Sequence, residues 1–125
     1  MQTNSYNMNI CMFEGYLLKQ PEYSENTTPS GKILHVIHII LKQPPDTYIQ
    51  CIGIGSLAIR LKALDLKQDD KVYIQATFKP YTTSEKKYVL RFVIDKLIVM
   101  EKKTSPIPLQ YEADNNTYDL LEYIT

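Results

Sequence analysis

With 125 residues, the chain has room for one domain and a short tail, which excludes a protein of two domains. No apolar run approaches the ~18 residues of a membrane span, and residues 1–8 lack the pattern of a secretion signal, so we expect a soluble, cytoplasmic protein. The net charge of zero divides into +4 over residues 1–103, which hold 14 basic and 10 acidic side chains, and −4 over residues 104–125.

Short apolar runs rich in Ile, Val and Tyr alternate with turn-forming clusters along the chain, a pattern typical of strands. Residues 20–31 hold two prolines and a glycine, and we expect a loop there. Pro44 and Pro45 end the second strand, because proline has no N–H to donate to a ladder. The five expected strands cover residues 8–18, 32–41, 48–54, 71–81 and 87–100.

The periodicity becomes helical after the third strand, with Ser56 as the expected N-cap and residues 68–70 closing the helix. Its apolar stripe consists of Leu57, Ile59, Leu61, Leu64 and Leu66. Beyond residue 104, Pro106 and Pro108 break any strand, so we expect no further sheet in the acidic tail.

Three strands, one helix and two strands is the order of the OB-fold, a small five-stranded barrel that binds single-stranded nucleic acids or oligosaccharides. We therefore predict an all-β protein with an OB-fold domain over residues 1–103 and an acidic tail over residues 104–125. A basic body with an acidic tail is frequent among nucleic-acid-binding proteins, although four acids also simply keep a tail solvated. Because element order does not prove closure, an SH3-like barrel or an α+β sheet is the alternative.

Five short segments of the chain form a recognisable pattern. One of them, Thr28-Pro29-Ser30-Gly31, stands ahead of the second strand, and the others are residues 9–17, 21–23, 54–58 and 70–75. In this order and spacing they resemble the bacterial-type single-stranded-DNA-binding protein family, and the resemblance covers about residues 7–101.

The departures from the family pattern indicate a compact, divergent member, of phage or mobile-element origin. Ile54 stands in place of the usual aromatic residue, and Ala76 in place of the usual glycine. Residues 42–47 form a much shorter connection than the family's DNA-embracing hairpin. The family's acidic-Pro-Phe ending is absent.

A single strand is held by a basic groove along its backbone and by aromatic faces under its bases. Alternation puts Tyr48, Gln50 and Ile54 on one face of the third strand, and the family's stacking Trp aligns with Tyr48. The predicted DNA-binding residues are Tyr48, Gln50, Ile54, Lys79, Tyr81, Lys87, Tyr88, Arg91 and His38. Each of these residues also has an interpretation without DNA. The tyrosines can pack within the sheet, His38 can be a packed or solvent-facing strand residue, and the basic residues can be ordinary surface charges.

The family assembles into dimers and tetramers through the first strand and the barrel faces. The resemblance therefore implies a homo-oligomer, with Asn9, Cys11, Ile49 and Tyr73 at the subunit interface. Family members also recruit replication proteins through an acidic C-terminus. Here Leu120, Leu121 and Ile124 lie at helical spacing among acids, so a short amphipathic turn in the tail is expected to dock in a groove.

The sequence contains no catalytic or metal-binding motif. His35 and His38 fall on opposite faces of one strand, and Cys11 and Cys51 lie in other strands, so we expect no metal and no cofactor. The glycines of residues 53–55 lack the remaining glycines of a dinucleotide loop, and no serine has a diagnostic His and Asp. We expect a binding protein that is not an enzyme.

The leading hypothesis is sequence-tolerant binding and protection of single-stranded DNA in replication, recombination or repair. The alternative is an OB-fold protein-interaction module, a replisome or primosome accessory with weak nucleic-acid binding, which the missing ring at Ile54 favours. A toxin-type oligosaccharide-binding domain is disfavoured by the absent secretion signal and the unpaired cysteines. RNA remains an alternative ligand, because stacking and phosphate contacts serve both nucleic acids.

Overall fold

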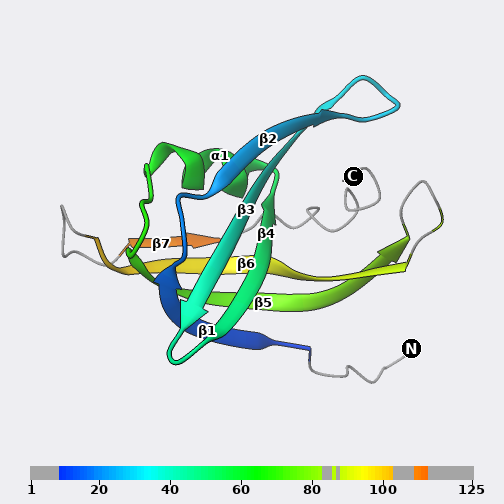
Figure 1. The fold of residues 1–125 in the computed structure, drawn as a ribbon. Coiled ribbons are helices and arrows are strands. Elements are labelled where there is room, and N and C mark those ends of the chain that lie inside the picture. The colour runs from blue at the N-terminus through cyan, green and yellow to red at the C-terminus, as the bar shows by residue number, and fades with distance from the viewer. Residues whose placement is uncertain (1–8, 83–85, 87, 103–108, 113–125) are drawn as a thin grey trace, which may run out of the picture.

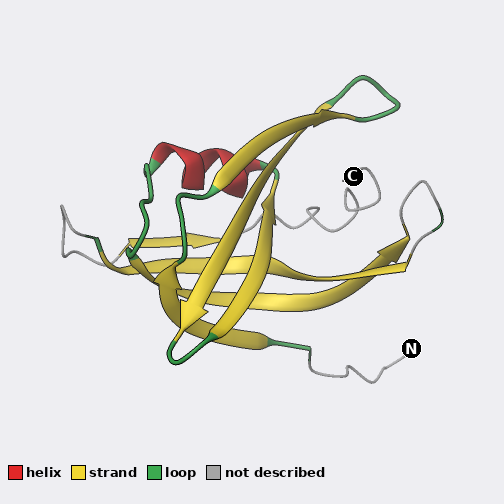
Figure 2. Cartoon of the chain, viewed as in Figure 1, coloured by secondary structure: helices red, strands yellow, loops and turns green. Residues whose placement is uncertain are grey.

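The computed structural model describes residues 9–82, 86, 88–102 and 109–112, and Figure 1 shows their arrangement. Within these residues the chain forms seven strands and one helix, coloured by type in Figure 2. In chain order they are β1 (Cys11–Leu17), β2 (Glu22–Thr27), β3 (Ile33–Gln43), β4 (Thr47–Ile54), α1 (Ser56–Ala63), β5 (Lys71–Thr82), β6 (Tyr88–Glu101) and β7 (Leu109–Glu112).

Five of the strands close into a barrel in the order β1-β5-β6-β4-β3, and β3 returns to β1. The closing contact pairs Tyr16 with Lys42 and Leu17 with Leu41. Neighbouring strands are antiparallel except β4 and β6, which are parallel. In the sequence, α1 and β5 come between these two strands. A Cβ on Gly15 would lie 2.8 Å from the Lys42 carbonyl oxygen, so only glycine allows β1 and β3 to approach this closely.

The core follows from strand alternation, because every second residue points into the barrel. The inward residues of β3 and β5 are fully apolar, and α1 adds Leu57, Ala58 and Leu61 at one end of the barrel. Together they form one buried cluster with members from β1, β3, β4, α1, β5 and β6. The five strands and the helix between the third and fourth of them confirm the predicted barrel.

The prediction of a loop over residues 20–31 is wrong for the middle of this range, which forms β2. This strand pairs along β3 from Glu22 opposite His38 to Thr27 opposite Ile33. Its sequence, Glu-Tyr-Ser-Glu-Asn-Thr, is mostly exposed and has no apolar alternation. β2 therefore forms because its backbone pairs with the long β3, and no hydrophobic pattern in its sequence predicts it.

The ends of the helix also differ from the expectation. Gly55, with a φ of 73°, is the N-cap in place of Ser56, and no side chain caps the helix. The positive φ suits glycine, which explains why the serine begins the helix instead. The helix ends at Ala63, and Leu66 reaches the core from the following turn.

The structure also has a strand beyond residue 104, where Pro106 and Pro108 led us to expect none. β7 pairs antiparallel with β6, from Leu109 opposite Val99 to Glu112 opposite Lys96. Pro106 and Pro108 precede this strand, so they do not interrupt its ladder. Part of the predicted tail thus belongs to the sheet, while residues 113–125 lie outside the described residues.

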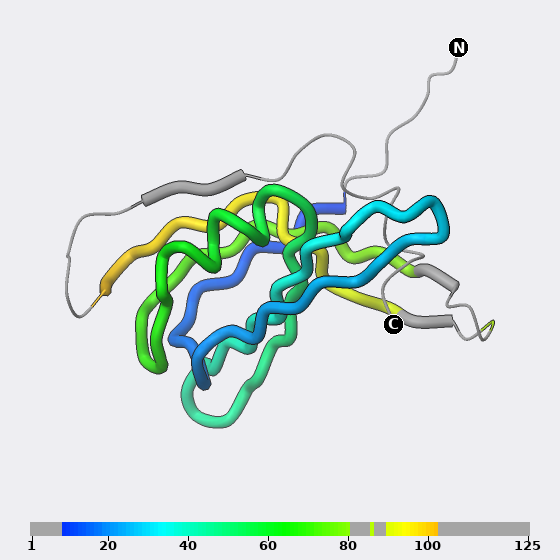
Figure 3. The backbone as a smooth tube through the Cα atoms, turned by 90° about the horizontal axis from the view of Figure 1, so that it is seen from above, coloured from blue at the N-terminus to red at the C-terminus, as the bar shows by residue number. Residues whose placement is uncertain are grey.

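Two hairpins, β2–β3 and β5–β6, project from the barrel on the same side, as Figures 1 and 3 show from two directions. The β3–β4 turn lies toward the other end, where β1 closes on β3. β4 runs between these regions and pairs with β3 on one edge and β6 on the other. The outer face of β3, β4 and β6 is therefore one continuous surface.

Candidate nucleic-acid interface

An open groove of about 730 Å³ lies on the surface formed by β3, β4 and β6. Four residues that the sequence predicts for DNA binding meet here, although three different strands carry them. The groove is lined by His38, Tyr48, Gln50, Cys51, Ile52, Leu90, Arg91 and Phe92.

The strand register explains why these residues meet. His38 of β3 lies opposite Ile52 of β4. β4 and β6 pair in parallel at Cys51–Phe92, so Gln50 and Arg91, one residue earlier on each strand, come to the same end of the groove. Sequence alternation shows which residues share a strand face, but it cannot show that the third and fifth predicted strands are neighbours.

Arg91 brings a positive charge to the wall of the groove, and Lys79 lies next to it on β5. Arg91 of β6 is directly opposite Lys79 of β5, so two cations occupy adjacent positions on one sheet face. Burial and then the Arg91 charge lower the pKa of His38 below its ordinary value of 6.5, while the Glu22 charge opposes the shift. The imidazole is therefore neutral at pH 7, and Arg91 supplies the cation on the groove wall.

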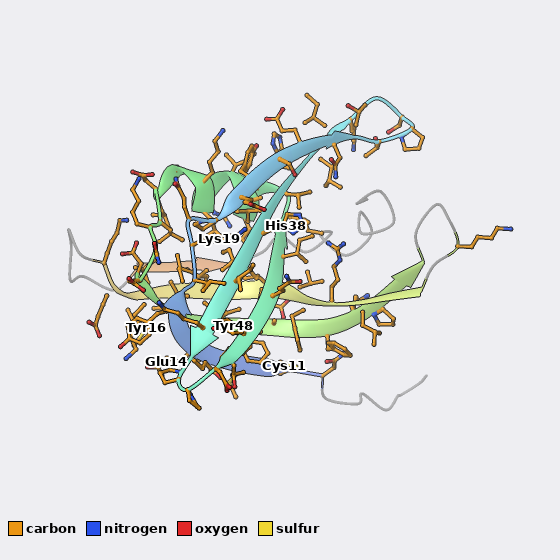
Figure 4. The ribbon with its side chains drawn as sticks, in the orientation of Figure 1. Cys11, Glu14, Tyr16, Lys19, His38 and Tyr48 are labelled. Carbon is orange, nitrogen blue, oxygen red and sulfur yellow. The ribbon has the colours of Figure 1, made fainter. Side chains whose placement is uncertain are left out.

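The groove also presents flat and apolar groups to solvent. The side chain of Tyr48 is 60% exposed, and Leu90 of β6 is another exposed residue of the groove lining. Figure 4 labels His38 and Tyr48 on the two strands that form one side of the groove. A ring that is mostly exposed on a strand is free to stack on a planar ligand.

Ile54, which the sequence also predicts for DNA binding, does not belong to this exposed surface. Its side chain is 0% exposed, and its partner on β3, Val36, is equally buried. Alternation correctly puts Ile54 on the same strand face as Tyr48, but only the first half of β4 is open to solvent. Ile52 and Ile54 in the second half are buried.

Three of the remaining predicted DNA-binding residues, Lys79, Tyr81 and Tyr88, belong to β5 and β6. Lys79 is half-buried and adjoins the groove through Arg91. The backbone pairs Tyr81 with Val89 and Thr82 with Tyr88 near the hairpin end. The side chains of Tyr81 and Tyr88, and the whole of Lys87, lie outside the described residues.

The four predicted interface residues have different positions. Ile49 packs against the core, which gives it a role within the barrel. Asn9 bonds both backbone groups of Phe78, since its Nδ2 donates to the carbonyl at 2.7 Å and its Oδ1 accepts from the amide at 3.1 Å. Cys11 and Tyr73 are half-buried, on β1 and β5 respectively.

Cys51, which lines the groove, is a protonated thiol. Burial, and to a lesser extent the Cys11 thiol, raise the pKa of Cys51 to about 12, so it is no nucleophile at neutral pH. On the other side of β3, His35 bonds the hydroxyl of Tyr23. Among the described residues, no three His, Cys, Asp or Glu side chains gather as metal ligands would, and no helix is long and apolar enough to span a membrane.

Sequence reasoning missed Tyr16 and Lys42, which adjoin the groove beyond Tyr48 in a smaller depression. The resemblance to the family does not mark them, and they come together only where β1 closes on β3. The sequence offered one signal for these two residues. They are a tyrosine and a lysine in two expected strands that become neighbours when the barrel closes.

No protein-family model and no curated protein matches this sequence. Among solved structures, the fold is similar to the crystal structure of the SSB domain of a protein from Synechococcus sp., with a TM-score of 0.55 and 15% sequence identity. The match covers 75% of this chain and 98% of that chain. Together with the closed ring of five strands and the helix between the third and fourth of them, this similarity establishes that the chain has the OB-fold.

Proposed function

We propose that the chain binds single-stranded DNA with little sequence preference and protects it during replication, recombination or repair. The observation that supports this most is the groove in which Tyr48, Gln50 and Arg91 meet. Stacking on a ring and neutralisation of phosphates are the two interactions that hold a single strand in an OB-fold. The solved SSB domain shares the fold.

In the proposed binding mode, each side chain of the groove contacts a different part of the ligand. A base stacks on the exposed face of Tyr48, and Arg91 and Lys79 neutralise successive phosphates. Gln50 is exposed in the groove lining and offers both a donor and an acceptor to base edges, whichever base is present. This mode of binding needs no cofactor and no catalytic step. We place it in the cytoplasm, where thiols such as Cys11 and Cys51 stay reduced.

The proposal is tested by a salt-dependent titration of labelled oligo-dT, with oligo-rU and duplex DNA of equal length as competitors. Each neutralised phosphate contributes a slope of about −0.7 to the log–log salt dependence, so affinity falls as salt rises. Arg91→Ala is expected to weaken binding and make this slope less negative. Arg60→Ala, which removes the same charge from the exposed face of α1, is the matched control.

Equal affinity for duplex and single strand, or an Arg91→Ala protein that binds like the parent at every salt concentration, contradicts the proposal. Tighter binding of oligo-rU than of oligo-dT would indicate that the ligand is single-stranded RNA instead of DNA.

The open edge of β1 supports a second proposal, a homo-oligomer. The ladder between β3 and β1 includes only Tyr16 and Leu17, and the Gln43 side chain of β3 donates to the Glu14 carbonyl at 2.7 Å. Among the described residues no strand pairs with this edge of β1 at residues 11–13. Unpaired strand edges tend to pair with another chain. Ile10 and Met12 are exposed beside that edge, so a dimer or tetramer formed there would bury them.

Light scattering tests the assembly, with a mass of two or four chains expected. Met12→Lys, which puts a charge into the contact, is expected to return the mass to one chain. Ile59→Lys on the exposed face of α1 is the control. An oligomer that binds no single strand would favour the alternative function, a protein-interaction module of the replisome or primosome.

A further inference from the structure

A second, smaller depression of about 140 Å³ begins on the far side of Tyr48 from the groove. Tyr48 lines both depressions and therefore forms the wall between them. We name the smaller one the Tyr16–Tyr48 pocket. It is lined by Tyr16, Lys42, Gln43, Pro44, Pro45, Asp46 and Tyr48.

Residues of β1, β3 and β4 and of the β3–β4 turn line the pocket, and Lys71 of β5 lies next to it through the strand register. Lys71 of β5 lies opposite Tyr16 of β1, Tyr16 opposite Lys42 of β3, and Lys42 opposite Tyr48 of β4. Directly opposed residues point to the same face of a sheet. Lysine and tyrosine therefore alternate in one row across the outer face of the barrel.

Both rings of this row are accessible. Tyr48 is 60% exposed and Tyr16 is 37% exposed, and Figure 4 labels both near the end of β3. The Lys71 ammonium lies 5.8 Å from the centre of the Tyr16 ring, within reach of a cation–π contact that orients it. Pro44 and Pro45 add two rigid apolar walls at the β3–β4 turn.

The charges around the pocket indicate what it accepts. The Lys42 ammonium lies 2.7 Å from an Asp69 oxygen, and Lys71 lies 3.0 Å from a Glu14 oxygen. Asp46 adds a further carboxylate to the lining. The nearby lysines are thus already matched by acids, which disfavours a phosphate. Rings and prolines instead favour a flat, neutral, aromatic group.

We propose that the Tyr16–Tyr48 pocket binds one nucleobase of the single strand that occupies the groove. The inference rests on the proposed function and extends the path of the strand past the β3–β4 turn to β1. Tyr48 then separates two bases, one in the groove and one in the pocket, while Tyr16 stacks on the second base. The Asp46 carboxylate can accept a hydrogen bond from a base N–H group.

Replacing Tyr16 tests the pocket without touching the groove. Tyr16→Ala is expected to lower the affinity for an oligo-dT of about 25 nucleotides roughly tenfold, the loss typical of one stacked base. Tyr16→Phe keeps the ring and is expected to bind like the parent. Fluorescence anisotropy gives the affinities, and circular dichroism confirms that each variant folds.

Photo-crosslinking of the unmodified protein gives a second measurement that does not depend on the folding of a variant. An oligonucleotide that carries bromodeoxyuridine is irradiated with the protein, and the crosslinked peptides are identified by mass spectrometry. Crosslinks to peptides with Tyr16 as well as Tyr48 are expected. Crosslinks to Tyr48 without Tyr16 overturn the inference.

The variants separate this inference from the proposed function. If Arg91→Ala weakens binding and Tyr16→Ala does not, the groove stands and the pocket is not on the strand's path. If neither change weakens binding, the proposed function itself fails. A Tyr16→Phe protein that loses as much affinity as Tyr16→Ala also overturns the inference, because the hydroxyl and not the ring would then be the group that acts.

Discussion

Tyr48 and Ile54 show how two residues on one strand face have different roles. Both point outward from β4, but Tyr48 is 60% exposed and Ile54 is 0% exposed. Alternation could predict the shared face, because it depends on backbone geometry alone. It could not predict burial, which depends on the neighbouring Val36 and on what else packs over that part of the sheet.

Substitution by alanine is expected to separate the two roles. Tyr48→Ala removes one stacking face and is expected to weaken oligo-dT binding by about 1–3 kcal/mol, with little effect on the free energy of unfolding. Ile54→Ala leaves a cavity and is expected to destabilise the fold by about 2–5 kcal/mol. Denaturant unfolding and anisotropy measure the two quantities, and a stable Ile54→Ala protein with lost DNA affinity would reverse the assignment.

Protonation of His38, in the groove lining, makes the stability of the fold depend on pH. Its pKa is lowered in the folded protein, by burial first and by Arg91 second, so the unfolded state binds a proton more readily. Where the unfolded state carries more protons, stability rises with pH. The stability that neutral His38 contributes is therefore full above the ordinary pKa of 6.5 and is lost as the pH falls from there toward the folded value.

An NMR titration of the His38 ring checks this directly. The free protein is expected to give a pKa below 6.5, and Arg91→Ala is expected to raise it by removing the nearby charge. Bound oligo-dT is expected to raise it too, because phosphates favour the imidazolium. A His38 pKa that is the same with and without oligo-dT would show that the strand does not pass this wall of the groove.

At the scale of elements, the barrel strands and the helix were predictable because they bury apolar residues at regular spacing. β2 and β7 were not, because their pairing with β3 and β6 comes from position in the sheet. The same limit explains the candidate site. Tyr48, Gln50 and Arg91 could be found as strand residues with the right chemistry, whereas the Tyr16–Lys42 contact depends on barrel closure.

The β6 end is fixed to the turn that follows α1 by one buried carboxylate. Asp70 is 1% exposed and its Oδ2 accepts from the Lys67 amide at 2.9 Å and from the Lys102 ammonium at 3.1 Å. Lys102→Met removes the ammonium and leaves a buried, unpaired charge, which is expected to cost about 3–5 kcal/mol of stability. Lys67→Met is the control, because Lys67 contributes its backbone amide to Asp70. Equal stability of both variants would contradict this role.

At the scale of the whole molecule, the closed ring of strands does not include β7. Truncation after residue 103 is therefore expected to leave the barrel folded. The melting temperature should fall, because β7 covers an edge of β6 and its pairing is lost. The truncation also removes four acids and no base, so DNA affinity is expected to stay equal or rise at low salt. Circular dichroism and a binding curve check both, and loss of folding would show that the barrel needs the removed segment.

Backbone-amide NMR during an oligo-dT titration shows whether a single strand lies in the groove of β3, β4 and β6. The largest shifts are expected at Tyr48, Gln50 and Arg91, with smaller ones at Lys79 and Tyr16, while α1 stays unchanged. Shifts centred on α1, or no shifts with saturating oligo-dT, would contradict binding of the strand in this groove.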